Sequence, residues 1–333
     1  MRRIFFVLLL LGGLFMFGLP HIVNQTANRS AEPPAHSPQA NSAKPEQPVK
    51  DGAVTVRLYR HATGTIETIP LDDYVTGVVA AEMPAEFPVE ALKAQAVAAR
   101  TYIVKRMLAG GLSNNIHPGA DTCDDPAHAQ AWLPAETLKE RWGLLKYYRY
   151  YYKIRVAVDD TSGVIITYQG QPIDPVFHSS CGGHTENSED VWKFAVPYLR
   201  GVVCPYDQPS ELVCRVTMPL GEVEKALGVN LSTAVSSGAN GLFQVVNTTA
   251  SGRPKTLLVS DKRMAAVDLR QKLGLRSTNF TARLDHGEIT FTTVGYGHGV
   301  GMCQYGAKGL AEHGQNYAQI IKHYYTGVEI SKL

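Results

Sequence analysis

Residues 71–83 read LDDYVTGVVAAEM and define the first helix expected in the folded body. Leu71, Val75 and Val78 recur at the spacing of one helix face, and Glu82 takes the next position on the same apolar stripe. A carboxyl group on an apolar face is costly to ionise, so it needs a partner, a bound proton or a chemical role. Glu82 is therefore a candidate general acid, although a glutamate at a helix end can also turn to solvent.

A second helix is expected close behind the first. Pro84 ends the first helix, because a proline disfavours helical backbone at the residue before it. Pro88 suits a first helical position, and the glycines at 110 and 111 end the segment. Its many alanines allow neighbouring helices to approach closely.

The rest of the body mixes helices with short strands. Strands are expected at 54–60, 65–69, 164–168, 173–178, 242–246, 256–259, 280–284 and 288–293, and further helices at 135–143, 145–158, 220–227, 262–273, 304–312 and 317–325. No steady alternation of strand and helix is present. The sequence therefore predicts an α+β fold, a single mixed body of helices and short strands with a substrate cleft.

The N-terminal part of the 333-residue chain predicts its location. Two arginines precede an apolar run at 4–19, and no good cleavage site follows it. We expect a cytoplasmic start and transmembrane anchor at 1–23, a flexible linker at 24–53 and the catalytic domain at 54–333. This organisation predicts a single-pass cell-membrane protein with its body outside the cytoplasm. A cleaved signal peptide is the alternative, and it also exports the body.

The formal net charge of +2 gives no bias toward nucleic acid, so no nucleic-acid partner is expected.

A polar loop is expected at 177–192, which reads FHSSCGGHTENSEDVW. Its hydrogen-bonding groups and its tryptophan suit sugar hydroxyls and a stacked ring, which makes His178, His184 and Thr185 candidates for substrate binding. An ordinary exposed loop is the alternative. The GxSxG motif of Ser–His–Asp hydrolases is absent.

A glycine-rich segment follows at 294–307, VGYGHGVGMCQYGA. Alternate glycines indicate close backbone contact or positive φ angles. His298 and Gln304 are candidates for substrate binding, and a tight structural loop around a packed histidine is the alternative. The spacing does not match GxGxxG and no phosphate-loop lysine is present, so a nucleotide is not expected.

His117, Cys123 and His128 lie within twelve residues and could bind zinc. Without a CxxC or HExxH motif the pattern is weak, and a metal-free loop is the alternative. The pairing of the remaining cysteines, which are Cys181, Cys204, Cys214 and Cys303, is left open.

Three long stretches in this order resemble the stage II sporulation protein D family of spore-forming bacteria. They are LDDYVTGVVAAEMPAEFPVEALKAQAVAARTY, FHSSCGGHTENSEDVW followed by PYL, and GYGHGVGMCQYGA with the helical end through HYYTGVEI. The resemblance covers about 54–330 together with the N-terminal apolar run.

The resemblance implies a lytic transglycosylase of sporulation engulfment. Such an enzyme cleaves the β-1,4 bond from N-acetylmuramic acid to N-acetylglucosamine in peptide-stripped peptidoglycan strands and leaves a 1,6-anhydro end. Its implied partners are the amidase stage II sporulation protein P and the membrane protein stage II sporulation protein M, between mother cell and forespore. No cofactor is required for this chemistry.

The resemblance also assigns residues. It implies that Glu82, in EMP, is the catalytic acid, and that Arg100 and Tyr198 are substrate-binding residues. Some family members hold zinc through a histidine and two cysteines spaced six apart. Here the third position is Ala129, and the adjacent His128 could replace it.

Two other functions stay open. One is a non-catalytic glycan-binding activator of a cell-wall amidase, since a fold does not by itself fix a function. The other is a zinc hydrolase, which the incomplete ligand set disfavours.

Overall fold

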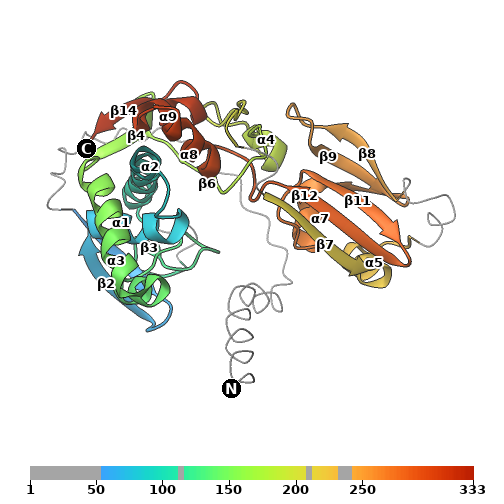
Figure 1. The fold of residues 1–333 in the computed structure, drawn as a ribbon, viewed down its shortest axis with the longest axis horizontal. Helices are drawn as coiled ribbons and strands as arrows, with labels where there is room; N and C mark the ends of the chain where they lie inside the picture. The colour runs from blue at the N-terminus through green and yellow to red at the C-terminus, as the bar shows by residue number, and fades with distance from the viewer. Residues whose placement is uncertain (1–53, 112–115, 208–211, 232–241) are drawn as a thin grey trace, which may run out of the picture. The chain divides into compact units, whose positions relative to one another are not determined.

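The computed structural model describes residues 54–111, 116–207, 212–231 and 242–333 (Figure 1). In chain order the elements are β1 (Thr55–Arg60), β2 (Thr65–Pro70), α1 (Leu71–Glu82), α2 (Val89–Leu108), β3 (Thr122–Cys123), α3 (Ala135–Asp159), β4 (Val164–Tyr168), β5 (Gln171–Pro172), β6 (Phe177–His178), α4 (Ser188–Val191), β7 (Val213–Pro219), α5 (Leu220–Leu227), β8 (Phe243–Thr248), β9 (Pro254–Val259), β10 (Lys262–Ala265), α7 (Ala266–Lys272), β11 (Phe280–Asp285), β12 (Glu288–Val294), β13 (Met302–Cys303), α8 (Gln304–Glu312), α9 (Tyr317–Tyr324) and β14 (Glu329–Lys332). The expected mixture of helices and short strands is confirmed.

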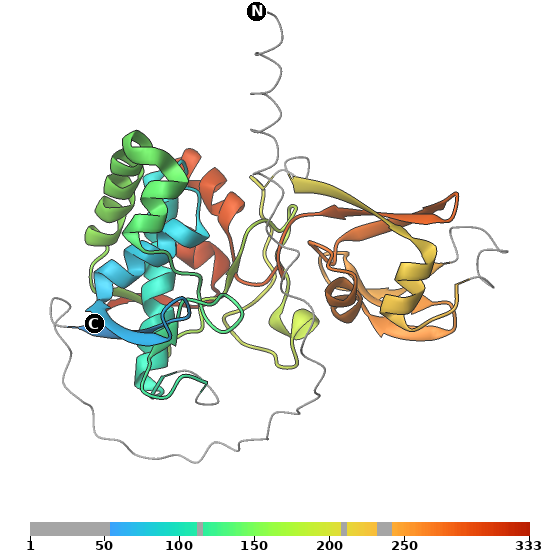
Figure 2. The same ribbon diagram turned by 90° about the horizontal axis from the view of Figure 1, so that it is seen from below.

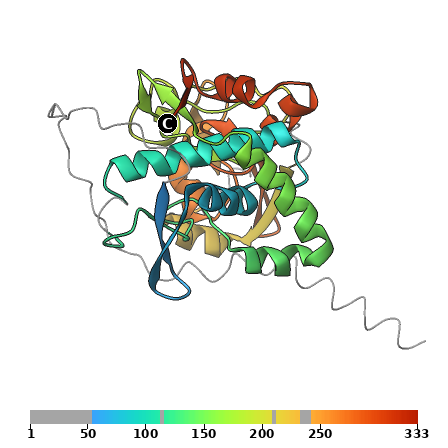
Figure 3. The same cartoon turned by 90° about the vertical axis from the view of Figure 1, so that its left-hand side faces the viewer.

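Helix α2 is the centre of the first hydrophobic core. It contacts α1, α3, α8, α9 and β4 (Figure 3). Its alanines at 91, 94, 96, 98 and 99 are all fully buried. Side chains of one carbon let the neighbouring helices approach closely, as the alanine content predicts.

Helix α3 is interrupted as predicted. The backbone is helical on both sides of Gly143, whose φ of 69° and ψ of 160° break the helix. A positive φ is inexpensive only for glycine, so this residue fixes the bend. The bend directs Arg141 and Trp142 toward the end of α1.

A second hydrophobic core lies within residues 218–291. It is built on the sheets β10-β9-β8 and β11-β12-β7, with α5 and α7 packed against them (Figure 2). The helix expected at 262–273 is wrong in its first turn. Residues 262–265 form β10, which pairs with β9 beyond a turn at Ser260, where φ is 55°.

The strand pairing around residue 170 also differs from the prediction. Strand β4 pairs with β5 and β14, whereas β6 pairs in parallel with β13, Phe177 opposite Met302 and His178 opposite Cys303. The short loop after β4 favoured a local hairpin, and only the tertiary structure reveals the distant partner. The β6–β13 pairing brings the polar loop and the glycine-rich segment together.

The membrane prediction is corrected. Across the described ranges, no helix combines the length and the apolar character that a membrane crossing requires. The expected transmembrane anchor and single-pass location are therefore not supported. Residues 1–23, on which they were predicted, and the linker at 24–53 lie outside the described residues.

Candidate active site

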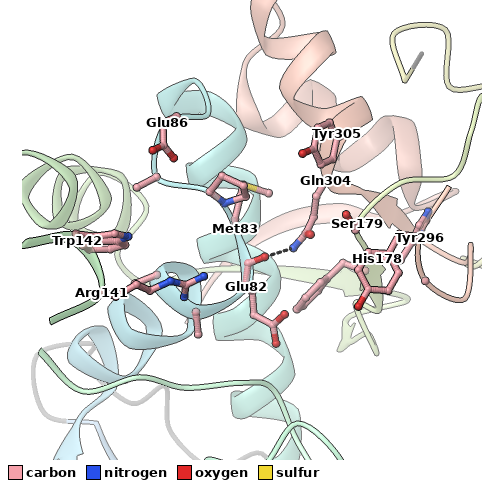
Figure 4. Close-up of a pocket in the computed structure, with 16 residues that line it drawn as sticks. Glu82, Met83, Glu86, Arg141, Trp142, His178, Ser179, Tyr296, Gln304 and Tyr305 are labelled. Atoms are coloured by element: carbon pink, nitrogen blue, oxygen red, sulfur yellow. Dashed lines mark hydrogen bonds between the residues drawn. The ribbon is translucent and has the colours of Figure 1, made fainter. Parts of the chain in front are cut away.

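A cleft of about 740 Å3 opens at the C-terminal end of α1. Three parts of the chain far apart in sequence form its walls (Figure 4). These are the end of α1 with the turn that follows it, the bend of α3, and the β6–β13 region with the start of α8. The lining residues are Ala80, Ala81, Glu82, Met83, Pro84, Ala85, Glu86, Arg141, Trp142, Phe177, His178, Ser179, Tyr296, Gly297, Gln304 and Tyr305.

Glu82 reaches the cleft because α1 ends directly after it. Met83 has φ −124° and ψ 138°, the extended backbone that a following proline favours. The buried stripe before it, which includes Val75, Val78 and Val79, fixes the helix against the core. The Glu82 side chain is half-buried at the edge of that core, as the stripe predicts.

Burial raises the pKa of the Glu82 carboxyl, and a hydrogen bond from the backbone of Ala131 opposes the shift. The Ala131 N–H donates to Glu82 Oε1 at 2.7 Å. An oxygen that accepts a short hydrogen bond is the less basic of the two, so a proton is favoured on Oε2. The carboxyl group is thus suited to donate a proton nearer to neutral pH than an exposed glutamate.

Glu86, the second carboxyl of the lining, has the opposite environment. It is exposed, and a hydrogen bond with Tyr150 lowers its pKa. Of the two lining carboxyls, Glu82 is the one whose surroundings favour a bound proton.

Gln304 connects the start of α8 to the end of α1. Its Nε2 donates to the backbone carbonyl of Glu82 at 3.0 Å and to Oε1 of Gln95 at 3.1 Å. The side chain is 5% exposed. Gln304 therefore lines the cleft and also fixes the backbone of Glu82.

The glycines of the glycine-rich segment permit the close approach that their pattern predicts. Gly295, Gly297, Gly299 and Gly301 all have positive φ. A Cβ at Gly297 would lie 2.7 Å from the Cβ of His178. Any larger residue there would displace the histidine that lines the cleft.

His178 is buried and lines the cleft. Its Nδ1 contacts the Val300 carbonyl at 3.1 Å, so Nδ1 carries the proton, because a carbonyl only accepts. Its Nε2 is buried without a hydrogen-bond partner among the described residues. Burial lowers the pKa of His178, which keeps the ring neutral.

His298 lies behind the cleft wall. Its Nδ1 accepts from the Val300 N–H at 3.1 Å, and its Nε2 donates to the Phe177 carbonyl at 2.9 Å. Burial lowers its pKa to about 4. His298 therefore holds the loop that carries His178 and is not itself part of the lining.

Arg100 does not reach the cleft. It is fully buried, and its Nη2 donates to Asp72 Oδ1 at 2.8 Å and to the Val158 carbonyl at 3.2 Å. Asp72 lies in the first turn of α1, at the opposite end from Glu82. A buried guanidinium cannot contact a glycan, so its expected role as a substrate ligand is corrected to a structural one.

Tyr198, His184 and Thr185, which were also expected to bind substrate, lie outside the cleft lining. The Tyr198 hydroxyl accepts from the Asp174 N–H at 3.1 Å. His184 Nδ1 contacts the carbonyl of Thr185, whose buried hydroxyl accepts from the Val202 N–H at 2.8 Å. The contacts of Tyr198 and Thr185 join residues 174 and 185 to the segment 198–202.

Two neighbouring residues of the cleft were missed. Arg141 and Trp142 supply a cation and an aromatic ring directly before the bend at Gly143. In Figure 4, Glu82 is drawn between Arg141 and Trp142 on one wall and His178 and Tyr296 on the other. The glycine that breaks α3 was visible in the sequence, but which element the bend faces was not.

The predicted metal ligands come together, with one addition. The donor atoms of His61, His117, Cys123 and His128 lie within 4.8 Å of one another. His61 lies in the turn after β1. Strand β1 pairs with β3, the strand that carries Cys123. No local motif links His61 to the other three, so sequence spacing could not find it.

These residues fit zinc, which favours four sulfur and nitrogen ligands. His117 Nε2 is buried without a hydrogen-bond partner among the described residues. His61 Nδ1 contacts Asp124 Oδ1 at 2.7 Å, the carboxylate support typical of a metal-binding histidine.

All five cysteines lie in the described residues and carry free thiols. Cys214 lies on β7, whereas Cys181, Cys204 and Cys303 lie close together with Asp207. No disulfide bond is formed among these five cysteines.

Comparison with known proteins identifies the family. A family model described as "Stage II sporulation protein" matches residues 59–168. The chain is 42% identical over 289 residues to stage II sporulation protein D of Bacillus amyloliquefaciens, which covers 86% of this chain and 81% of the relative. It is 38% identical over 327 residues to stage II sporulation protein D of Bacillus subtilis, covering 98% and 93%.

A more distant relative is the amidase enhancer of Bacillus subtilis, 28% identical over 307 residues, which covers 77% of this chain and 40% of the relative. The two stage II sporulation proteins D match at higher identity and over most of both lengths. The chain therefore belongs to the stage II sporulation protein D family.

Proposed function

We propose that this sporulation protein is a lytic transglycosylase that cleaves the β-1,4 bond between N-acetylmuramic acid and N-acetylglucosamine in peptide-stripped strands. The half-buried Glu82 carboxyl, whose pKa is raised by burial, at the wall of a 740 Å3 cleft carries the proposal. Pockets of about 300–1,000 Å3 typically hold small ligands, so the cleft can enclose part of a glycan strand.

In the first step Glu82 Oε2 gives its proton to the bridging oxygen. The bond to C1 of the muramic ring breaks, the leaving sugar takes the proton, and positive charge develops at C1. The carboxylate left on Glu82 stabilises that charge. Ala131 holds Oε1 in place throughout.

In the second step the same carboxylate acts as the base. It takes the proton of the C6 hydroxyl while that oxygen attacks C1, which closes the 1,6-anhydro ring and restores the acid. No water and no second carboxyl are consumed, unlike in ordinary glycosidases. The raised pKa of Glu82 supports its use as the proton donor, and the carboxylate left after the first step is the base that the second step needs.

A glycan-binding activator of an amidase is the second candidate, because the more distant relative is named amidase enhancer. An activator would need the cleft for binding but not a carboxyl that exchanges protons. The lytic reaction uses strands that an amidase has stripped, so an amidase such as stage II sporulation protein P is a proposed partner under both functions. Stage II sporulation protein M is a proposed partner by family resemblance alone.

We also propose a zinc site formed by His61, His117, Cys123 and His128. Zinc there would tie the turn after β1 to the loop at 117–128 and would take no part in the glycan chemistry, since none of the four lines the cleft. The buried His117 Nε2 supports this assignment.

Product mass tests the function. The full chain is incubated with peptide-free glycan strands, and the ends are analysed by mass spectrometry. Anhydro ends that vanish with Glu82→Gln support the lytic reaction. Reducing ends, heavier by one water, would indicate a hydrolase. Intact strands, with an amidase stimulated equally by the wild type and by Glu82→Gln, would support the activator.

A further inference from the structure

A second cluster of metal-ligating side chains lies under the wall of the cleft. Cys181, Cys204, Asp207 and Cys303 are at most 2% exposed. Their three sulfurs and a carboxylate oxygen lie within 4.8 Å of one another. None of the four lines the cleft, and the proposed chemistry uses none of them.

The fold brings these residues together from three segments. The β6–β13 pairing fixes Cys303, and Cys181 follows β6 by three residues. Cys204 and Asp207 come from one turn, in which the Asp207 N–H donates to the Cys204 carbonyl at 3.3 Å. The four side chains are therefore brought together by the tertiary fold and not by a local sequence motif.

The carboxylate is held by backbone and hydroxyl donors. Asp207 Oδ2 accepts from the Cys181 N–H at 2.6 Å, the Gly182 N–H at 2.8 Å and the Ser180 hydroxyl at 2.9 Å. A buried carboxylate is costly unless it is paired or bound to a metal. No cation of a described side chain forms a salt bridge with Asp207.

Hydrogen bonds hold two of the three sulfurs, and the Cys303 thiol itself donates to Asp207 Oδ2 at 3.1 Å. Cys303 Sγ accepts from the N–H groups of Cys181 and Gly306, both at 3.3 Å, and the second lies at the N-terminus of α8. The Tyr324 hydroxyl lies 3.0 Å from Cys204 Sγ. In metal sites, hydrogen bonds of this kind orient the side chains that bind the ion.

We propose that Cys181, Cys204, Cys303 and Asp207 form a structural Zn2+ site. Thiolate-rich sets select zinc over magnesium or calcium. With Zn–S of about 2.3 Å, tetrahedral ligands lie roughly 3.8 Å apart, which agrees with the compactness of this cluster. On binding, the three thiols release their protons to solvent and the four ligands each form one bond to the ion.

The site would fasten the cleft wall. It joins the loop after β6, which follows His178, to the start of α8, which carries Gln304. Gly306 packs directly against the cluster, since a Cβ there would lie 2.1 Å from Cys204 Sγ and from the Tyr324 hydroxyl. Zinc here would stabilise the geometry of the cleft without touching substrate.

Metal analysis of the full chain, purified under reducing conditions, tests the site. The variant His117→Ala with Cys123→Ser first removes the other zinc site, so that failure of one proposal is separate from failure of the other. About one zinc per chain is expected to remain in this background. Adding Cys204→Ser should remove it, and adding Cys214→Ser, outside the cluster, should not.

Cobalt spectroscopy of the same background provides a readout that does not depend on the folding of the cysteine variant. Thiolate-to-cobalt charge-transfer absorption is expected, and X-ray absorption should report three sulfurs and one oxygen. Asp207→Asn should weaken binding while circular dichroism stays unchanged. A metal-free background under zinc excess, or a chain mass lower by two hydrogens from a disulfide, would overturn the proposal.

Discussion

The Nε2 of Gln304 lies 3.0 Å from the backbone carbonyl of Glu82, across 222 residues of sequence. This contact joins the start of α8 to the last residue of α1. Glu82 is thereby held from two sides, since the Ala131 N–H donates to its side chain and Gln304 donates to its backbone carbonyl.

Removing the Gln304 donor should loosen the acid. Gln304→Met keeps the length of the side chain but leaves the Glu82 carbonyl and Gln95 Oε1 without this N–H. A buried polar group left unpaired costs about 1–3 kcal/mol. We expect that loss of stability in denaturant titrations and a lower kcat. Lys308→Met, on the same helix, is the control and should change neither.

Glu82→Gln tests the acid directly. An amide cannot donate a proton of suitable acidity, and loss of general acid–base catalysis typically costs about 10²–10⁴-fold in rate. Release of anhydro ends should fall by that factor. Glu86→Gln, in the same lining, should retain most activity. Equal losses in both variants would contradict the assignment of Glu82 as the acid.

The raised pKa of Glu82 also predicts a pH dependence. The protonated acid is the active form, so activity should fall as pH rises through the raised pKa. The folded state binds this proton more tightly than the unfolded state, so ionisation costs stability as pH rises from the unfolded to the folded pKa. At pH 7 Glu82→Gln should therefore unfold at a temperature no lower than the wild type, and the difference should vanish in acid.

Local patterns predicted most of the helices and the position of Glu82 at the end of α1. The stripe of α1 placed Glu82 at the edge of the core, and Gly143 marked the break in α3. What failed depended on distant partners. The β6–β13 pairing and the strand character of 262–265 are set by neighbours that no local period reveals.

The same limit applies to the site. Glu82, His178 and Gln304 were predicted from the sequence and meet in one cleft. The sequence could not show whether Arg100 binds substrate or is buried, because nothing in it reveals that Arg100 pairs with Asp72. His61 and Arg141 were missed, since each reaches its site from an element that is distant in sequence.

Arg100→Met should act through stability. Removing one partner of a buried ion pair costs about 3–5 kcal/mol, because Asp72 and two carbonyls lose their donor. The unfolding temperature should fall sharply, while KM of the fraction that remains folded stays near the wild-type value. A large rise in KM at unchanged unfolding temperature would restore the role in substrate binding.

Arg141 should bind the anionic substrate in place of Arg100. Among the described lining residues it is the only lysine or arginine. Peptide-stripped strands carry a free lactyl carboxylate on each muramic ring. An exposed ion pair contributes about 0–1 kcal/mol, so Arg141→Gln should raise KM by up to roughly five-fold at low salt. Lys139→Gln, outside the lining on α3, is the control, and added salt should remove the difference.

His298 should make the fold sensitive to acid. Its pKa is lowered from 6.5 to about 4, so the unfolded chain takes up the proton first as the pH falls. Stability should therefore decrease between pH 6.5 and about 4, and the neutral ring contributes fully only above that window. In His298→Gln the unfolding free energy should be lower at pH 7 but should change less across the window. His286→Gln, at a side chain that is 94% exposed, should leave the profile as it is. Urea unfolding of the wild type and of His298→Gln at several pH values measures both profiles. If stability falls as steeply with pH in the variant as in the wild type, another group causes the acid sensitivity.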